Sequence, residues 1–449
     1  MPKPQPQSNP IQAAVSSWLS AVAPPDHADP AAWKQKLRDH APKRFTIYEP
    51  MALLPPGSFA HPAWTEELGR HDAAAADSLW ALILEHLSRV GGPAARATHL
   101  AVSEGIPART PDGAGENVTR SPGGGLRLLR GDFGPAACDD PPSERDFQRA
   151  FWVSTRQNGI WQTWAPRWTM FSRGNVKEKA RLLGFPPAGV PLSLPPPPPL
   201  PLPLPPLWAV DLYAGIGYFA FCYARLGMRV LCWELNPWSV EALRRGARLN
   251  RWTVGVFGRP GRGLPSEDVA SSSARIVVLW EDNRAAGWRA DELRRSGGGW
   301  LRCVRHVNCG LLPTSRPTWR CALSLTRTTT AAARGGQAWL HLHENVGARG
   351  GLAGRRAEEE RRRLVALRAP RQLRAVADEP AHVENVGDGE TRRRRDEVEA
   401  LLRGYDADDA DDAVPGPGRA IRVLAVEKVK TYAPGVWHCV FDVHVTREV

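Results

Sequence analysis

Short apolar runs recur through the second half of the chain, and each has the length of a buried strand bounded by polar or glycine-rich residues. They lie at 208–213, 229–234, 275–281, 303–308 and 338–343. After the second run, residues 238–250 place apolar side chains at the spacing of one helix face. This alternation of strand-like and helical patterns predicts βαβ units and an α/β fold with a mostly parallel sheet.

The last apolar stretch has a different pattern. Residues 421–445 form two long runs around the turn Ala-Pro-Gly, and Trp437, Cys439 and Phe441 alternate onto one face of the second run. Such a pattern is typical of two antiparallel strands joined by a tight turn. The sheet is therefore predicted to finish in a C-terminal antiparallel hairpin.

Changes in composition divide the chain into two predicted domains. Residues 191–207 are dominated by proline, which fixes φ and lacks a backbone donor, so they predict an extended linker or loop. We place a smaller α+β region, rich in tryptophan and alanine, at 1–175 and the βαβ domain at 176–449. Residues 348–420 interrupt the strand pattern and are predicted to be an insertion.

The formal net charge of +12 favours a polyanionic partner such as nucleic acid, although arginine-rich tracts are also common on solvated surfaces. The seven cysteines include no C-x-x-C pair, which argues against a disulfide framework or structural zinc. His341 and His343 alternate within an apolar run, as on one face of a strand, so no metal site is expected. Neither a signal peptide nor a long apolar segment is evident, which predicts a cytoplasmic protein without membrane contact.

The first predicted strand leads into the sequence "VDLYAGIGYF" (210–219). Gly215, Gly217 and Ala220 form a G-x-G-x-x-A pattern between a strand and a helix, which is typical of a nucleotide-binding turn. Glu234 follows the second strand, 19 residues after Gly215, where a carboxylate accepts hydrogen bonds from the ribose hydroxyls of an adenosine. The pattern predicts a Rossmann-like cofactor site.

NAD and S-adenosylmethionine both carry such a ribose, and two features favour the sulfonium compound. Asp211 lies inside the motif as D-x-x-x-G-x-G, where its carboxylate meets a cationic ligand. Asp282 and Asn283 end the third strand, where an aspartate accepts from the adenine amino group. The alternative is a glycine-rich turn flanked by ordinary surface acids.

The segment 208–250 resembles the class I fold of the tRNA guanosine-37 methyltransferase relatives, and more closely the fungal tRNA wybutosine-synthesising aminocarboxypropyltransferases. Other stretches are similar to that family in the same chain order, at 44–64, 156–183, 307–315, 341–347 and 426–445. The resemblance covers most of the chain except the linker and the insertions.

The resemblance implies cofactor contacts at five positions, which are Ser172, Lys179, Glu234, Asp282 and Asn283. The last three agree with the strand-end pattern, whereas Ser172 and Lys179 come from the resemblance alone. Lys179 suits the methionine carboxylate as a cation. On sequence pattern alone, Lys177 and Lys179 would be solvated helix positions.

The loop after the fourth strand, 308–313, lacks the Asn/Asp-Pro-Pro-aromatic sequence of amino methyltransferases and resembles that of the aminocarboxypropyltransferases. The implied reaction moves the 3-amino-3-carboxypropyl group of S-adenosylmethionine to C7 of 4-demethylwyosine at position 37 of phenylalanine tRNA, and methylthioadenosine is the by-product. Glu178 and Asn308 are candidates for proton transfer or substrate orientation, with a structural role as the alternative for each.

Arg156, Arg167 and Arg173 are the predicted tRNA contacts, with the N-terminal region engaging the anticodon loop. The neighbouring Trp161, Trp164 and Trp168 offer stacking faces for a flipped base, but their spacing also fits the buried face of a helix. A monomer is expected. Two rival functions stay open, a tRNA guanosine-37 N1-methyltransferase and a non-catalytic tRNA-binding protein.

Overall fold

The computed structural model describes most of the chain, and these residues group into two compact units. The described residues are 9–26, 28–105, 117, 119, 121–122, 125–185, 207–258, 264–297, 304–327, 337–347, 389–410, 419–433 and 435–447. Unit 1 comprises residues 1–171 and 236–246, and unit 2 comprises 172–235 and 247–449. The proline-rich segment 191–206 lies outside the described residues, as do 348–388 and 411–418 of the predicted insertion.

Unit 1 combines helices with two small antiparallel or mixed sheets, so the predicted α+β class is confirmed. Its helices are α1 (Pro10–Ala21), α2 (Pro30–Asp39), α3 (Pro62–Gly69), α4 (Ala73–Ser88), the short 3-10 helix η1 (Gly92–Arg96), α5 (Glu144–Arg149) and most of α8 (Pro237–Leu249). Its strands are β1 (Thr46–Tyr48), β2 (Met51–Leu54), β3 (His99–Ser103) and β4 (Leu126–Arg130) in one sheet, and β5 (Val153–Gln157) with β6 (Ile160–Trp164) in another. The tryptophans of this region supply much of its core, since Trp18, Trp33, Trp64 and Trp80 are all buried together.

Strands β5 and β6 correct one prediction. Trp161 and Trp164 lie on a strand, not on a helix face, and their side chains therefore point to opposite sides of the hairpin. The turn is made by Asn158 and Gly159, both with positive φ (51° and 76°), which is the conformation that an Asn-Gly pair favours between antiparallel strands. Trp164 is buried and Trp161 is exposed.

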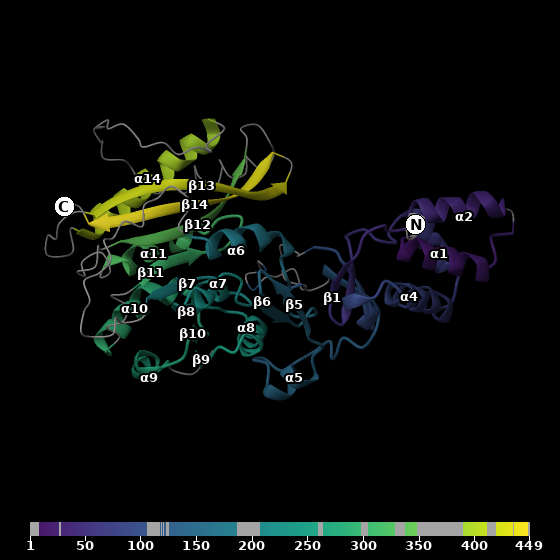
Figure 1. The fold of residues 1–449 in the computed structure, drawn as a ribbon, viewed down its shortest axis with the longest axis horizontal. Coiled ribbons are helices and arrows are strands. Elements are labelled where there is room, and N and C mark those ends of the chain that lie inside the picture. Colours follow the sequence, from purple (N-terminus) through teal and green to yellow (C-terminus); the bar gives the residue numbers. More distant parts are fainter. Residues whose placement is uncertain are drawn as a thin grey trace, which may run out of the picture. The chain divides into compact units, whose positions relative to one another are not determined.

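Unit 2 is built around one eight-stranded sheet (Figure 1). Its strands are β7 (Trp208–Asp211), β8 (Arg229–Trp233), β9 (Val254–Phe257), β10 (Ile276–Leu279), β11 (Val304–Cys309), β12 (Ala338–Gly347), β13 (Arg419–Ala433) and β14 (Val436–Arg447). Their order is β13-β14-β12-β11-β7-β8-β10-β9, and β14 runs antiparallel to both of its neighbours. The predicted Rossmann-like fold with a C-terminal antiparallel hairpin is confirmed, and β9 is a strand that the sequence pattern did not predict.

Helices cover both faces of this sheet. They are α6 (Val176–Leu183), preceded by the short η3 (Arg173–Asn175), then α7 (Ala220–Arg225), α9 (Ser266–Ser271), η4 (Asn283–Ala285), α10 (Ala286–Arg295), η6 (Arg316–Thr318), α11 (Trp319–Leu325) and α14 (Gly389–Ala410). Helix α14 lies along β13 and against α11, and its Val398 and Leu402 are fully buried in the sheet's core (Figure 1). This part of the predicted insertion is therefore an integral layer of unit 2.

After β7, the chain places β8 and β10 on one side of that strand, and it then returns to place β11 on the other side. In open α/β sheets this reversal leaves a crevice at the carboxyl ends of the two central strands, which is where ligands bind. The loop after β7, with its two predicted glycines, lies at that position. Within the described part of the chain, no helix is long and apolar enough to cross a membrane, and no group of three or more His, Cys, Asp or Glu side chains could hold a metal ion.

Candidate active site

The loop between β7 and α7 has a backbone that requires glycine at two positions. Gly215 has φ 52° and Gly217 has φ 91°, a region that residues with a Cβ rarely adopt. A Cβ on Gly217 would also lie 2.6 Å from the ring of Phe221, which is fully buried. The loop therefore curves tightly over the first turn of α7, as a nucleotide-binding turn does.

Glu234 is joined directly to this loop. Its Oε2 atom accepts a hydrogen bond from the backbone N–H of Gly215 at 2.7 Å, and Ala214 N–H donates to the carbonyl of Trp233 at 3.1 Å. The acid that follows β8 is thus held beside the glycine turn that follows β7. The contact of Glu234 with a ribose, which the 19-residue spacing predicts, stays a prediction.

The end of β10 contributes to the same edge of the sheet. Asn283 Nδ2 donates to the carbonyl of Leu212 at 2.7 Å, which fixes the first residue of the glycine loop. Asp282 caps η4 by accepting from Arg284 N–H, and the hydrogen bond and charge of Arg284 hold the pKa of this carboxyl below its usual value. Asp282 is part-exposed and carries a negative charge at neutral pH.

Beneath the loop, Asp211 of β7 and Asn308 of β11 form a buried polar pair. Asn308 Nδ2 and the N–H of Tyr213 both donate to Asp211 Oδ1, at 3.1 and 3.2 Å. Burial raises the pKa of Asp211 to about 6, against the opposing effect of the Asn308 hydrogen bond. Asp211 Oδ2 and Asn308 Oδ1 are buried acceptors without a well-aligned hydrogen-bond partner among the described residues, although the backbone N–H of Ala220 also acts to lower the pKa of Asp211. Such orphaned acceptors fit a site that takes a ligand with hydrogen-bond donors or positive charge.

Ser172 and Lys179, expected from the resemblance, both meet Tyr218 of the glycine loop. The N–H of Ser172 donates to Tyr218 Oη at 2.9 Å, and Lys430 Nζ donates to Ser172 Oγ at 3.4 Å. Lys179 Nζ lies 5.8 Å from the centroid of the Tyr218 ring. Burial lowers the pKa of Lys179 to about 8, so an anionic group of a ligand would stabilise its charged form.

Glu178 lies in a different environment from its neighbour. Its carboxylate accepts two hydrogen bonds from Arg181, at 2.9 and 2.7 Å, and Arg181 also forms an ion pair with Asp442 of β14. Asp442 in turn accepts from His341 Nδ1 at 2.7 Å. Burial raises the pKa of Glu178 to about 7, while Arg181 opposes that rise.

The sequence did not predict this ionic network. Arg181 and Asp442 are 261 residues apart, and no local pattern connects them. The available signal was weak: Asp442 and His341 are polar residues at inward-facing positions of otherwise apolar strands. A buried charge on a strand implies a partner on the element that covers it.

The predicted tRNA contacts divide between the two units. Arg156 and Arg167 belong to unit 1, and Arg173 belongs to unit 2, where it starts η3. Arg156 is exposed on β5, and its guanidinium lies 5.9 Å from the centroid of the exposed Trp161 ring. Trp168 stacks on Trp238 at 4.8 Å and is half-buried, so Trp161 is the more accessible stacking face.

Comparison with known proteins connects this site to one set of curated relatives. The chain is 40% identical over 306 residues, 68% of its length, to "tRNA wybutosine-synthesizing protein 2" of Schizosaccharomyces pombe, and it spans 62% of that relative. It is 28% identical over 467 aligned residues to the protein of the same name from Saccharomyces cerevisiae, covering 98% of this chain and 81% of that one. No protein-family model matches.

Solved structures with a similar arrangement have lower identity. One is P. horikoshii TYW2 in complex with MeSAdo, with 18% identity and a TM-score of 0.47 over 97% of this chain and all of that one. Another is M. jannaschii tRNA m1G37 methyltransferase, with 11% identity and a TM-score of 0.44 over all of this chain and 82% of that one. The resemblance stated from the sequence is confirmed by the curated relatives.

Proposed function

Because this chain is a homologue of the proteins named tRNA wybutosine-synthesizing protein 2, we propose that it is an S-adenosylmethionine-dependent tRNA aminocarboxypropyltransferase. It would transfer the 3-amino-3-carboxypropyl group to C7 of 4-demethylwyosine at position 37 of phenylalanine tRNA. The observation that best supports the proposal is the junction of three strand ends at the glycine loop, where Gly215 bonds to Glu234 and Leu212 to Asn283. A cytoplasmic location and a monomeric state stay predictions from the sequence.

Four of the polar groups around the loop have a proposed partner on S-adenosylmethionine. Glu234 accepts from the ribose hydroxyls, Asp282 from the adenine amino group, and Lys179 pairs with the methionine carboxylate. The orphaned Oδ2 of Asp211 accepts from the methionine ammonium group, directly or through water. Opposite charges facing the carboxylate and the ammonium group, which share the α-carbon at the far end of the amino acid arm, would fix its orientation.

That orientation decides the reaction. The sulfonium activates three carbons, and the enzyme selects the γ-carbon of the amino acid arm by presenting it in line with the nucleophile. The C7–Cγ bond forms as the Cγ–S bond breaks; the electron pair stays on sulfur to give methylthioadenosine, and C7 then releases its proton to water. Asn308, the penultimate residue of β11, is proposed to orient the acceptor base through the loop 310–315 that follows this strand. Because Arg181 engages both oxygens of Glu178, we propose that Glu178 holds α6 in place instead of moving a proton.

The test is product analysis with tRNA that carries 4-demethylwyosine. Release of methylthioadenosine, with a matching mass increase in the nucleoside, is the expected result. Release of S-adenosylhomocysteine would identify an N1-methyltransferase instead. Absence of any heat when S-adenosylmethionine is titrated in would favour a non-catalytic tRNA-binding protein.

A pair of variants tests whether S-adenosylmethionine binds at this site. Glu234→Ala is expected to weaken S-adenosylmethionine binding at least about tenfold, which is about 1.4 kcal/mol for the loss of a charged acceptor. Glu267→Ala removes an exposed carboxylate of α9 in the same unit and should leave the affinity unchanged. Equal affinities for the two variants would contradict the ribose assignment.

A further inference from the structure

The loop 310–315, which follows β11, is anchored at its far end as well. Ser315 donates to the carbonyl of His343 through both its N–H and its Oγ, at 3.2 and 2.8 Å. Asn345 N–H donates to the carbonyl of Pro313 at 2.8 Å, and Thr314 forms an isolated antiparallel bridge with Glu344. The loop therefore runs from the Asp211–Asn308 pair to the last residues of β12.

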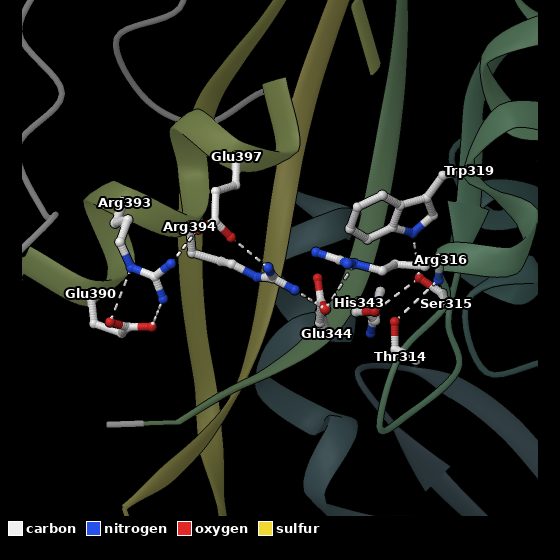
Figure 2. Close-up of polar contacts among 10 residues, drawn as sticks. All are labelled: Thr314, Ser315, Arg316, Trp319, His343, Glu344, Glu390, Arg393, Arg394 and Glu397. Atoms are coloured by element: carbon white, nitrogen blue, oxygen red, sulfur yellow. Dashed lines mark hydrogen bonds and ion pairs between the residues drawn. The ribbon is translucent and has the colours of Figure 1, made fainter. Parts of the chain in front are cut away.

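Glu344 lies at this anchor, between two arginines from different elements (Figure 2). Its Oε1 atom is 3.2 Å from Nε of Arg316, the residue that follows the anchored loop, and it also accepts from Arg394 of α14. The Glu344 side chain is only 6% exposed, and its Oε2 has no hydrogen-bond partner among the described residues. A carboxylate buried to this degree needs cations or hydrogen-bond donors to compensate its lost hydration, and Glu344 has two cations.

Both arginines have further contacts that fix their directions. Arg316 lies over the ring of Trp319 at 5.4 Å, and Trp319 Nε1 donates to Ser315 Oγ at 2.9 Å (Figure 2). Arg394 also bonds to Glu397 of its own helix at 2.7 Å. Glu344 thus joins the loop end to a helix that is anchored separately in the core.

We propose that Glu344, Arg316 and Arg394 position the loop 310–315 for the acceptor base, and that α14 thereby contributes to the activity of the transferase. The inference rests on the proposed function, because it assumes that this loop holds the acceptor. None of the three residues belongs to the glycine loop or to the acids beside it. Loss of the anchor should therefore impair use of the tRNA and leave the affinity for S-adenosylmethionine as it is.

The test compares two arginines of the same helix. Arg394→Gln removes the contact with Glu344, whereas Arg395→Gln removes an equal charge whose ion pair, among the residues that the structure describes, is with the adjacent Asp396. With the full-length protein, we expect Arg394→Gln to lower kcat for methylthioadenosine release at saturating tRNA at least tenfold. The Kd for S-adenosylmethionine from calorimetry should stay within twofold, and Arg395→Gln should match the wild type in both measurements. Arg394→Lys, which keeps a cation beside Glu344, should recover part of kcat.

Normalising kcat to the fraction that binds S-adenosylmethionine separates positioning from simple loss of fold. Wild-type kcat in Arg394→Gln, or equal losses in both glutamine variants, would overturn the proposal. So would an Arg394→Gln protein that no longer binds S-adenosylmethionine, because the role of Arg394 would then be general stability. If the wild-type enzyme itself released no methylthioadenosine, the proposed function would fail instead.

Discussion

Gly217 and Gly227 separate two reasons why a residue must be glycine. Both have strongly positive φ, 91° and 89°, but a Cβ on Gly217 would meet the Phe221 ring at 2.6 Å, whereas a Cβ on Gly227 would meet nothing within 4 Å. Gly227→Ala should therefore cost only backbone strain, about 1–2 kcal/mol. Gly217→Ala should cost about 2 kcal/mol more, because the loop or the buried ring must move. Urea denaturation of both variants measures the difference in their free energies of unfolding. Equal losses of stability would show that the loop adjusts to the added methyl group at no energetic cost.

The lowered pKa of Lys179 predicts that the affinity for S-adenosylmethionine depends on pH. Its pKa in the folded protein is lowered from 10.5 to about 8 by burial, so the side chain loses its charge as the pH rises through that value. If Lys179 pairs with the methionine carboxylate, the loss of its charge should contribute a roughly eightfold fall in S-adenosylmethionine affinity between about pH 7.5 and about pH 9, in addition to the fall from the ligand's own α-amino group, which titrates in the same range. Isothermal calorimetry at several pH values measures this fall.

Two controls isolate the lysine in that experiment. Methylthioadenosine lacks the amino acid arm, so its affinity should not change over the same range. Lys179→Gln should bind S-adenosylmethionine more weakly than the wild type. Its affinity should also lack the part of the pH dependence that comes from the titration of Lys179. An identical pH profile for Lys179→Gln and the wild type would remove Lys179 from the binding site.

At the scale of elements, α6 is held on the sheet by charge as well as by apolar contact. Arg181 bonds to Glu178 on its own helix and to Asp442 on β14, and Asp442 is fully buried. Burial alone would raise the pKa of Asp442, but His341 and Arg181 outweigh it and hold the pKa below the usual value. The pair places α6, and with it Lys179, against the carboxyl ends of the strands.

Arg181→Gln should be strongly destabilising for this reason. It leaves two buried carboxylates without their cation, and breaking such a pair costs about 3–5 kcal/mol. Arg225→Gln, on the exposed side of α7, should change the free energy of unfolding by less than about 0.5 kcal/mol. Urea unfolding followed by circular dichroism compares the free energies of unfolding of the two variants. Similar curves would mean that water solvates the two carboxylates in place of Arg181 with little loss of stability.

At the scale of the whole molecule, the net charge of +12 bears on the interaction with tRNA. Each phosphate contact adds about 0.7–0.9 to the slope of log affinity against log salt concentration. If the exposed Arg156 contacts the backbone, Arg156→Ala should reduce that slope by about 1 and leave S-adenosylmethionine binding unchanged. Filter binding at several salt concentrations tests this. Arg89→Ala, which removes an arginine paired with Glu85 on α4, is the control, and equal slopes for the two variants would exclude Arg156 as a phosphate contact.

Much of the sheet could be predicted because parallel strands buried on both faces leave continuous apolar runs. Strand β9 escaped prediction because it is short, includes Gly255 and is only partly buried. The tryptophan spacing in β5–β6 also fitted a helix face, and the stronger local signal for a hairpin was the Asn158-Gly159 pair between the two strands. Helix α14 was hidden in a charged segment, because only a few of its side chains, Val398 and Leu402 among them, are fully buried.

The sequence by itself determined that a glycine turn follows β7. It also determined the polar residues at the ends of the next strands, which are Glu234 after β8 and Asn283 after β10. Those features are local, since each depends on a few consecutive residues and on the strand just before them. Only the tertiary structure decided which buried charges meet, as in Arg181 with Asp442 and Arg394 with Glu344. Pairs 261 and 50 residues apart leave no local pattern, because a charge is buried only where the folded chain brings its partner within reach.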